Sequence, residues 1–150
     1  MRLRGVILPR DTGRTTSERN IELIRSGIDA FNRRDFDVAL AALRDDVTWA
    51  RFLSKAEADD PVVRGKQELR AVWESQVEAV DLRLEPEEFI AAGDDKVIVP
   101  TRMVAHGSGS EIALSAPVTW VWTIDEEGLA ARVEAFESRA AALEAVGLEL

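Results

Sequence analysis

Apolar residues in the first half of the chain recur every three or four positions, which is the spacing of helices that bury one face. Thr15 and Glu18 form a capping-box pattern at the start of the first such stretch. Asp35 is placed to cap a second, shorter stretch. The predicted order is a helix over 16–32, a short helix after Asp35, a strand over 47–52, a polar loop over 53–64 and a helix over 66–80.

In the second half the apolar period changes to two, which indicates strands. Ser138 can then cap a closing helix that ends before Gly147. Turns of four or five residues separate the strands, so we expect an antiparallel meander. The predicted strands run over 82–90, 97–105, 111–124 and 129–137.

Pro100 and Pro117 fall inside two of these strands. Proline has no N–H to give to a strand ladder, so bulges or edge positions are expected there. Bulges bend a sheet, and a bent sheet wrapped around a helix encloses a cone-shaped cavity. The sequence therefore predicts an α+β fold in which a cone-shaped, strongly curved antiparallel sheet wraps around the N-terminal helices. The expected organisation is a flexible tail over 1–15 and a single domain over 16–150.

The strand over 111–124 shows the clearest alternation and predicts which side chains face the cone. Its inward set is Ile112, Leu114, Val118 and Trp122. The opposite face of the sheet mixes apolar and polar residues, a composition suited to a semi-polar homodimer interface. That outer set is Arg102, Val104, Thr119, Val121, Thr123, Arg132 and Phe136.

Composition narrows the function classes. The chain has 150 residues and a net charge of −9 at pH 7, so it is expected to repel the phosphates of nucleic acids. It has no Cys, no Tyr and one His, which excludes disulfides, thiol nucleophiles and a tyrosine acid. The sequence contains neither a glycine-rich phosphate loop nor a metal-ligand cluster, and we predict no cofactor and no metal.

Membrane insertion is not expected either. No segment approaches the roughly 20 apolar residues that span a bilayer. The apolar run near the start is too short for a signal-peptide core. The prediction is a cytoplasmic protein.

Two charged residues fall on faces that otherwise consist of core positions. Arg51 shares a side with Val47 and Trp49, and Glu137 shares a side with Ala135. A buried charge is costly unless it is paired, hydrated or functional. In one interpretation Glu137 is a general base and Arg51 stabilises an enolate-like oxygen. In the other, the two form a structural ion pair that closes one end of the cone.

Large apolar side chains are the candidate wall of a ligand site. Four tryptophans and one methionine are predicted to line a pocket for a flat apolar ligand, or else to fill the core. These residues are Trp49, Trp73, Met103, Trp120 and Trp122.

Three local motifs follow one another along the chain. They are Arg44-Asp45-Asp46-Val47-Thr48-Trp49, Arg64-Gly65-Lys66-Gln67-Glu68-Leu69 and Arg132-Val133-Glu134-Ala135-Phe136-Glu137. Together with the order of elements, they resemble the nuclear transport factor 2-like superfamily and, within it, the SnoaL-like proteins. The resemblance covers about residues 17–147 and implies the curved-sheet fold and, as in many relatives, a homodimer.

The resemblance also bears on activity. The positions that match the catalytic Tyr and two Asp of ketosteroid isomerases hold Gly27, Arg51 and Trp120, so that activity is not expected. The position that matches an acidic residue of SnoaL-type polyketide cyclases holds Glu137. We predict a protein that binds a small hydrophobic, oxygenated molecule, with an isomerase, cyclase or hydrolase activity as the enzymatic form of this function. The alternative is a non-catalytic ligand-binding or dimeric interaction module.

Overall fold

The computed structural model of the protein describes residues 15–50, 62–107 and 113–147. The predicted tail, except for Thr15, lies outside these residues, as does most of the predicted loop over 53–64. The helices are α1 (Thr16–Asn32), α2 (Phe36–Ala41), α3 (Lys66–Ala79) and α4 (Arg139–Ala145). The strands are β1 (Leu43–Ala50), β2 (Val62–Arg64), β3 (Val80–Pro86), β4 (Ile90–Ala92), β5 (Lys96–Gly107), β6 (Ala113–Ile124) and β7 (Ala130–Phe136).

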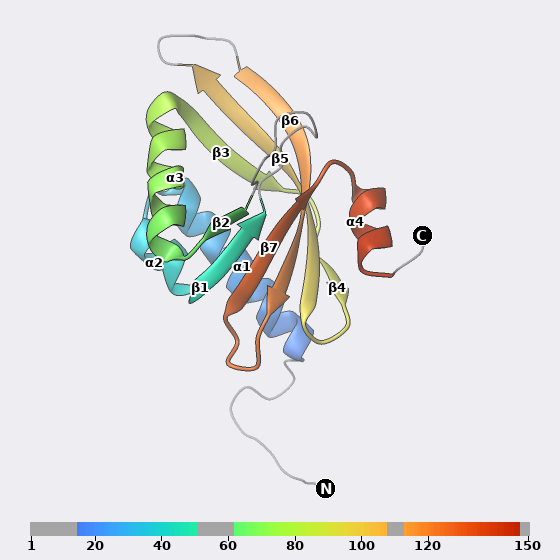
Figure 1. Ribbon diagram of the computed structural model, residues 1–150. Coiled ribbons are helices and arrows are strands. Elements are labelled where there is room, and N and C mark those ends of the chain that lie inside the picture. The colour runs from blue at the N-terminus through green and yellow to red at the C-terminus, as the bar shows by residue number, and fades with distance from the viewer. Residues whose placement is uncertain (1–14, 51–61, 108–112, 148–150) are drawn as a thin grey trace, which may run out of the picture.

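All seven described strands belong to one strongly curled sheet (Figure 1). Its order is β2-β1-β7-β6-β5-β3, and β4 pairs with β5 beside β3. The predicted α+β class and curved sheet are confirmed. The strands of the expected meander pair antiparallel, but β1 lies parallel to β7, which differs from the expected antiparallel sheet. Short turns predict only how consecutive strands pair, whereas β1 and β7 are joined by a long connection that permits either direction.

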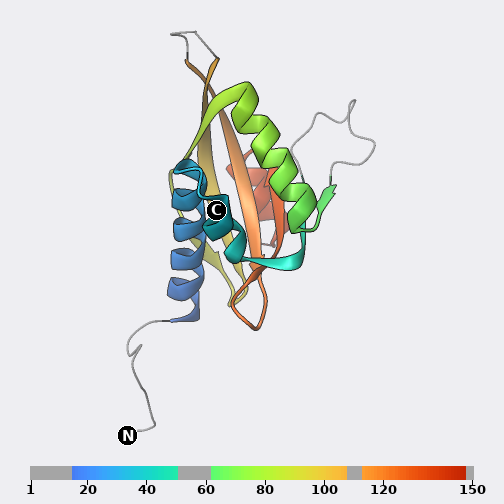
Figure 2. The same cartoon turned by 90° about the vertical axis from the view of Figure 1, so that its left-hand side faces the viewer.

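Helices cover both faces of the sheet, but unequally. Figure 2 shows α1, α2 and α3 in front of the sheet and α4 behind it. We call the face toward α1–α3 the inner face and the face toward α4 the outer face. The main buried cluster, which includes Ile24, Phe31, Trp73 and Trp122, lies on the inner face. A smaller cluster that includes Val121 and Leu143 lies on the outer face.

Polar side chains cap the start of α1 and tie its last turn to the sheet. The predicted capping box is present: the Glu18 N–H donates to Thr15 Oγ1 at 3.0 Å, and the Thr15 N–H donates to Glu18 Oε1 at 2.9 Å. At the other end, the Asn32 amide donates to the Leu84 carbonyl at 2.8 Å and accepts from the Leu84 N–H at 2.9 Å. The Asn32 side chain thus pairs with β3 as a neighbouring strand would, which holds α1 against the inner face.

Pro117 occupies an edge position and Pro100 a gap between two partner strands, and neither causes a register shift. Pro100 lies between the part of β5 that pairs with β3 and the part that pairs with β4. Pro117 lies on β6 beyond the end of β7. Neither position requires an N–H on its open side. The register shifts occur elsewhere, between Leu43 and Thr48 on β1 and near the β6–β7 turn.

The predicted inward set of β6 is correct only over the part of the strand that other elements cover. Val118 and Trp122 are buried in the inner cluster, but Leu114 is 71% exposed. The prediction for Leu114 is therefore wrong, and Ile112 lies outside the described residues. The physical reason is that β7 ends opposite Thr119, so this end of β6 extends past β7.

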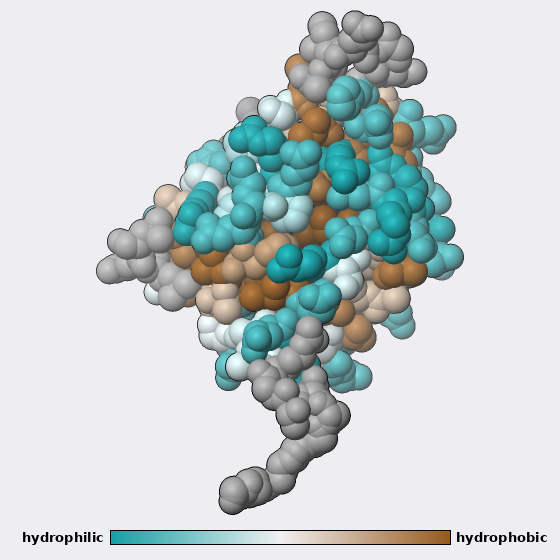
Figure 3. All heavy atoms as spheres, turned by 180° about the vertical axis from the view of Figure 1, so that it is seen from behind, coloured by the Kyte–Doolittle hydropathy of each residue, from teal (hydrophilic) through white to brown (hydrophobic). Residues whose placement is uncertain are grey.

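The outer surface of the protein is mainly polar. Figure 3 shows the molecule from behind, where hydrophilic side chains cover most of the surface and apolar ones appear between them. Such exposed apolar surface is normal for a globular domain. No helix among the described residues is long and apolar enough to cross a membrane.

Candidate functional site

A cavity of about 170 Å³ lies between the inner face of the sheet and the helices α1–α3. We call it the cone cavity. Its wall is formed by Gly27, Ile28, Phe31, Ala39, Leu43, Trp49, Val63, Leu69, Val72, Trp73, Gln76, Leu82, Leu84, Met103, Val118, Trp120, Trp122 and Ala135. Drug-sized ligands occupy pockets of roughly 300–1,000 Å³. An apolar cavity of about 150 Å³ is known to bind benzene, so the cone cavity as it stands matches a ligand of about one ring.

The cavity opens on the side of α3 and the ends of β3 and β5. Gln76 on α3 is exposed, while Val72, Leu82 and Met103 are half-buried. The residues at the other end of the wall, such as Leu43 and Leu69, are fully buried. The cavity therefore has a closed apolar floor and a mouth that carries one amide side chain.

Trp49 lies at the centre of the aromatic wall. Its ring packs edge to face against Trp73 at 5.7 Å, Trp120 at 6.0 Å and Trp122 at 5.5 Å between ring centroids. Trp73 in turn packs edge to face on Phe31 at 5.4 Å. Such pairs add about 0.5–1.5 kcal/mol each beyond the burial of their area. The aromatic residues thus hold one another in place around the cavity.

Polar groups are scarce on this wall. Among the described lining residues none is Asp, Glu, His, Lys or Arg, and Gln76 is the one with a polar aliphatic side chain. The indole Nε1 of Trp122 is buried, and no described residue accepts its hydrogen bond. The described wall can therefore bind apolar surface and donate hydrogen bonds, but it holds no acid or base.

The structure brings the five predicted ligand-binding residues together. Trp49, Trp73, Met103, Trp120 and Trp122 come from β1, α3, β5 and β6, and all five line the cone cavity. They meet there because each lies at an inward-facing position of its strand or on the apolar face of α3.

Of the two predicted catalytic residues, only Glu137 is described by the structure, and it is not among the described residues of the cavity wall. Glu137 follows the last residue of β7 in a bend, is exposed, and does not contribute to the wall, whereas Ala135 two positions earlier does. The alternation that placed Glu137 inward ends with the strand at Phe136. Arg51 lies outside the described residues.

Several lining residues were not predicted as part of the site. Ile28 and Phe31 belong to the helical stripe of α1, so their burial was visible in the sequence although their role as cavity wall was not. Val63 lies on β2, inside the segment predicted to be a loop. A three-residue strand gives too short an alternation to be recognised.

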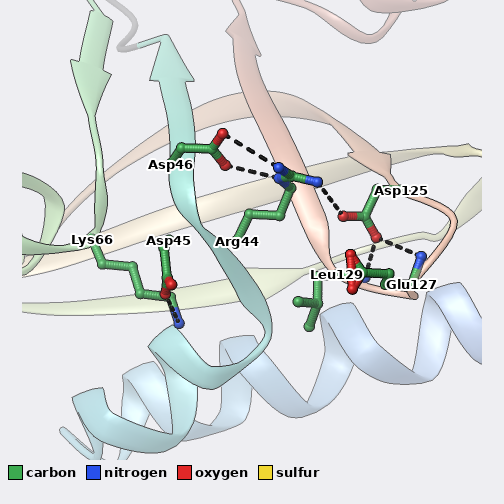
Figure 4. A network of polar contacts seen from close by, with 7 residues as sticks. All are labelled: Arg44, Asp45, Asp46, Lys66, Asp125, Glu127 and Leu129. Carbon is green, nitrogen blue, oxygen red and sulfur yellow. Dashed lines mark hydrogen bonds and ion pairs between the residues drawn. The ribbon is translucent and has the colours of Figure 1, made fainter.

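A polar network lies at another end of the sheet, where the β6–β7 turn meets the start of β1 (Figure 4). The Arg44 guanidinium contacts Asp46 at 2.8 Å and Asp125 at 2.9 Å. Asp125 also accepts hydrogen bonds from the N–H groups of Glu127 and Leu129, both at 2.9 Å. This carboxylate therefore closes its own turn and ties the turn to β1.

These contacts shift the titration of the network. The hydrogen bond from the Leu129 N–H lowers the pKa of Asp125, and Arg44 and the Glu127 N–H lower it further, against the opposing effect of partial burial. The hydrogen bond from Arg44 likewise lowers the pKa of Asp46. The pKa of Arg44 is raised by Asp46 first and by Asp125 second. The network stays charged at neutral pH and has a structural role.

No described group of three or more His, Asp or Glu side chains is placed to hold a metal ion. A curled α+β sheet with an apolar cone cavity under its N-terminal helices is the nuclear transport factor 2-like fold. Within that fold, a profile of the SnoaL-like domain matches residues 24–133, and the chain belongs to this family. No protein of curated function matches the chain.

Solved structures support the fold. An NTF2-like protein of unknown function from Burkholderia pseudomallei is 23% identical, with a TM-score of 0.66 over 86% of this chain and 98% of that one. TerC, co-crystallised with polyporic acid, is 23% identical, with a TM-score of 0.67 over 85% and 98%. A Mycobacterium tuberculosis protein in complex with estradiol-17beta-hemisuccinate is 16% identical, with a TM-score of 0.68 over 81% and 95%. At these identities the similarity concerns the fold.

Proposed function

We propose that the protein binds a small hydrophobic, oxygenated molecule in the cone cavity. The observation that carries the proposal is the cavity itself, which stays open among four tryptophans. Protein interiors are packed with few voids larger than a water molecule, and an unfilled apolar cavity lowers stability. A cavity of about 170 Å³ with an apolar wall is therefore better explained by an occupant than by packing alone.

Two neighbours with the same fold support this proposal. One was crystallised with polyporic acid and the other with a hemisuccinate of estradiol. Both molecules are largely hydrophobic and carry oxygen atoms. They are examples of what a cavity in this fold accommodates, and we transfer only that class of ligand to this chain.

The described wall favours ligand binding over acid–base catalysis, since none of its residues titrates near neutral pH. The second candidate is a cofactor-independent isomerase, cyclase or hydrolase that uses Glu137 as a base with Arg51. One observation favours it: Ala135 lines the cavity two positions before Glu137 on the same chain segment. Under this second candidate, Glu137→Gln abolishes turnover of the bound ligand. Under the first, the substitution leaves ligand binding unchanged and there is no turnover to lose.

Calorimetric titration with ethylbenzene, a neutral single-ring probe, tests binding in the cavity. The wild-type protein is expected to bind it, and Ala135→Phe is expected to abolish binding because the new ring fills the cavity from its wall. Ala131→Phe is the matched control, since Ala131 lies on the same strand and does not line the cavity. Equal binding by the Ala135→Phe protein contradicts the proposal, as does failure of the wild-type protein to bind both ethylbenzene and acetophenone, a probe of similar size that carries a ketone oxygen.

We also propose that the protein forms a homodimer through the part of the outer face that α4 leaves open. Of the expected interface residues, Arg102 and Arg132 are exposed and Val104 and Phe136 are half-buried. Val121 is 1% exposed beneath α4 and is therefore not available to a partner. Light scattering at high micromolar concentration is expected to report a dimer. A monomer under these conditions rules out the proposed homodimer. A dimer that binds no small molecule would instead favour the interaction-module alternative.

A further inference from the structure

The indole N–H of Trp122 is a hydrogen-bond donor without a described acceptor. Trp122 is only 4% exposed, and its side chain points from β6 into the wall of the cone cavity. More than about 90% of buried polar groups in proteins have a hydrogen-bond partner. A buried donor without a partner has lost its hydrogen bond with water, and no bond within the protein replaces the free energy of that bond. An acceptor supplied by a ligand would recover it.

The surroundings of this donor are apolar. The ring of Trp49 packs edge to face on Trp122, with an angle of 77° between the rings, and an aromatic face is at best a weak acceptor. The Trp122 nitrogen is covered by neighbouring atoms, so these atoms must shift before a ligand reaches it.

The charge of the ligand is limited by the same wall. Its described residues include no Lys, Arg or His that could neutralise an anion, and no Asp or Glu that could neutralise a cation. The protein as a whole carries a net charge of −9, which further disfavours anions. Burying an unpaired charge costs much more free energy than one hydrogen bond returns.

We infer that the ligand of the cone cavity is uncharged and carries an acceptor oxygen, such as that of a ketone, quinone or ether, which accepts the hydrogen bond of the Trp122 N–H. This inference rests on the proposed binding function and narrows the ligand class. The Gln76 amide at the mouth is available to a second polar group at the other end of such a ligand. Trp122 is then a specificity-determining residue, since it selects for an oxygen that a plain hydrocarbon lacks.

Three probes of similar size test the inference by titration of the full chain. Ethylbenzene has no acceptor, acetophenone has a neutral acceptor, and benzoate has a charged one. Trp122→Phe is expected to lower the affinity for acetophenone about two- to tenfold more than the affinity for ethylbenzene. This is the range for the loss of one neutral hydrogen bond. Trp120→Phe, on the same strand and in the same wall, is the matched control and is expected to affect both probes equally. Benzoate is expected not to bind at pH 7.

A second readout needs no variant of uncertain folding. In a nitrogen–proton NMR spectrum of the wild-type protein, acetophenone is expected to shift the Trp122 indole N–H signal downfield, and ethylbenzene is not. Equal effects of Trp122→Phe on both probes with no selective shift, or benzoate binding as tight as acetophenone, would overturn the inference and leave the proposed function intact. Failure of all three probes to bind would overturn both.

Discussion

Between Val118 and Trp122 the two faces of β6 are both buried, but they are built differently. On the inner face, Trp120 and Trp122 take part in a network of rings that meet edge to face and leave a cavity. On the outer face, Val121 packs beneath α4 against Ala142 and Leu143, in a cluster of five buried residues. Both sides exclude water, with Val121 at 1% and Trp122 at 4% exposure.

The difference lies in the shape of the side chains. On the inner face, rings in edge-to-face contact surround an open volume, whereas the outer cluster consists of small aliphatic side chains. The inner face thus combines stability with an open volume, while the outer face provides stability with no described cavity of its own. We therefore propose ligand binding for the inner face, whereas α4 packs on the outer face. The predictions below test this assignment.

The largest expected effect is on the ring network. Trp73 is 7% exposed and contacts Phe31, Phe36 and Trp49. Trp73→Ala is expected to lower the free energy of unfolding by about 3–5 kcal/mol, as measured by urea denaturation. Trp73→Phe is the control and is expected to cost less, because one ring is kept. A loss below about 1 kcal/mol for the alanine variant would show that the network does not hold the inner face together.

A smaller effect is expected on the outer face. Leu143→Ala is expected to lower the free energy of unfolding by about 2–3 kcal/mol, because it empties part of the small cluster beneath α4. Ethylbenzene affinity should stay at the wild-type value, since Leu143 does not line the cone cavity. Leu114→Ala is the control, because an exposed side chain contributes within about 0.5 kcal/mol. A large loss of ethylbenzene affinity in the Leu143→Ala protein would show that packing on the outer face affects binding on the inner face. That result would contradict the separate roles of the two faces.

The smallest effect concerns pH. The pKa of Asp125 is lowered in the folded protein, so its contribution to stability is fully present above the unfolded value of about 3.9. The contribution is lost as the pH falls through the lower, folded value. Asp125→Asn is expected to destabilise the protein at pH 7, and this difference from the wild type should shrink below about pH 4 in thermal unfolding scans.

Two controls separate this effect from a general acid response. Asp81→Asn removes an ion pair with Arg34 in which the Asp81 side chain is 77% exposed, and such exposed pairs contribute little. Ethylbenzene affinity should not change over the pH range in which the protein stays folded, because no described residue of the cavity wall titrates. A constant difference between Asp125→Asn and wild type down to pH 3 would mean that Asp125 acts through shape and not through charge.

The sequence predicted the fold wherever a pattern was long or a cap was explicit. The capping box at Thr15 places the start of α1 correctly, and the cap at Ser138 does the same for α4. The parallel pairing of β1 with β7 could not be predicted, because it depends on contacts between distant segments. The exposure of Leu114 was missed for a related reason: alternation gives the face of a residue, but not how far the covering elements extend.

The site was predicted in part. The four tryptophans and Met103 were recognisable because large apolar side chains at inward positions either fill a core or line a cavity. Glu137 was assigned an inward position by continuing the strand period, whereas β7 ends one residue before it. The unpaired N–H of Trp122 could not be foreseen, since it depends on which atoms surround one nitrogen.

The parallel pair of β1 and β7 has a consequence for the newly made chain. Leu43 pairs with Ala130, across more than half of the sequence, so β1 acquires its central neighbour only when the last strand has been synthesised. Until then the apolar faces of α1 and α3 and the ring of Trp49 have no complete sheet to cover them. Long-range pairing of this kind slows folding and leaves apolar surface open to aggregation. Chains that end before residue 130 are therefore expected to aggregate more readily than full-length chains.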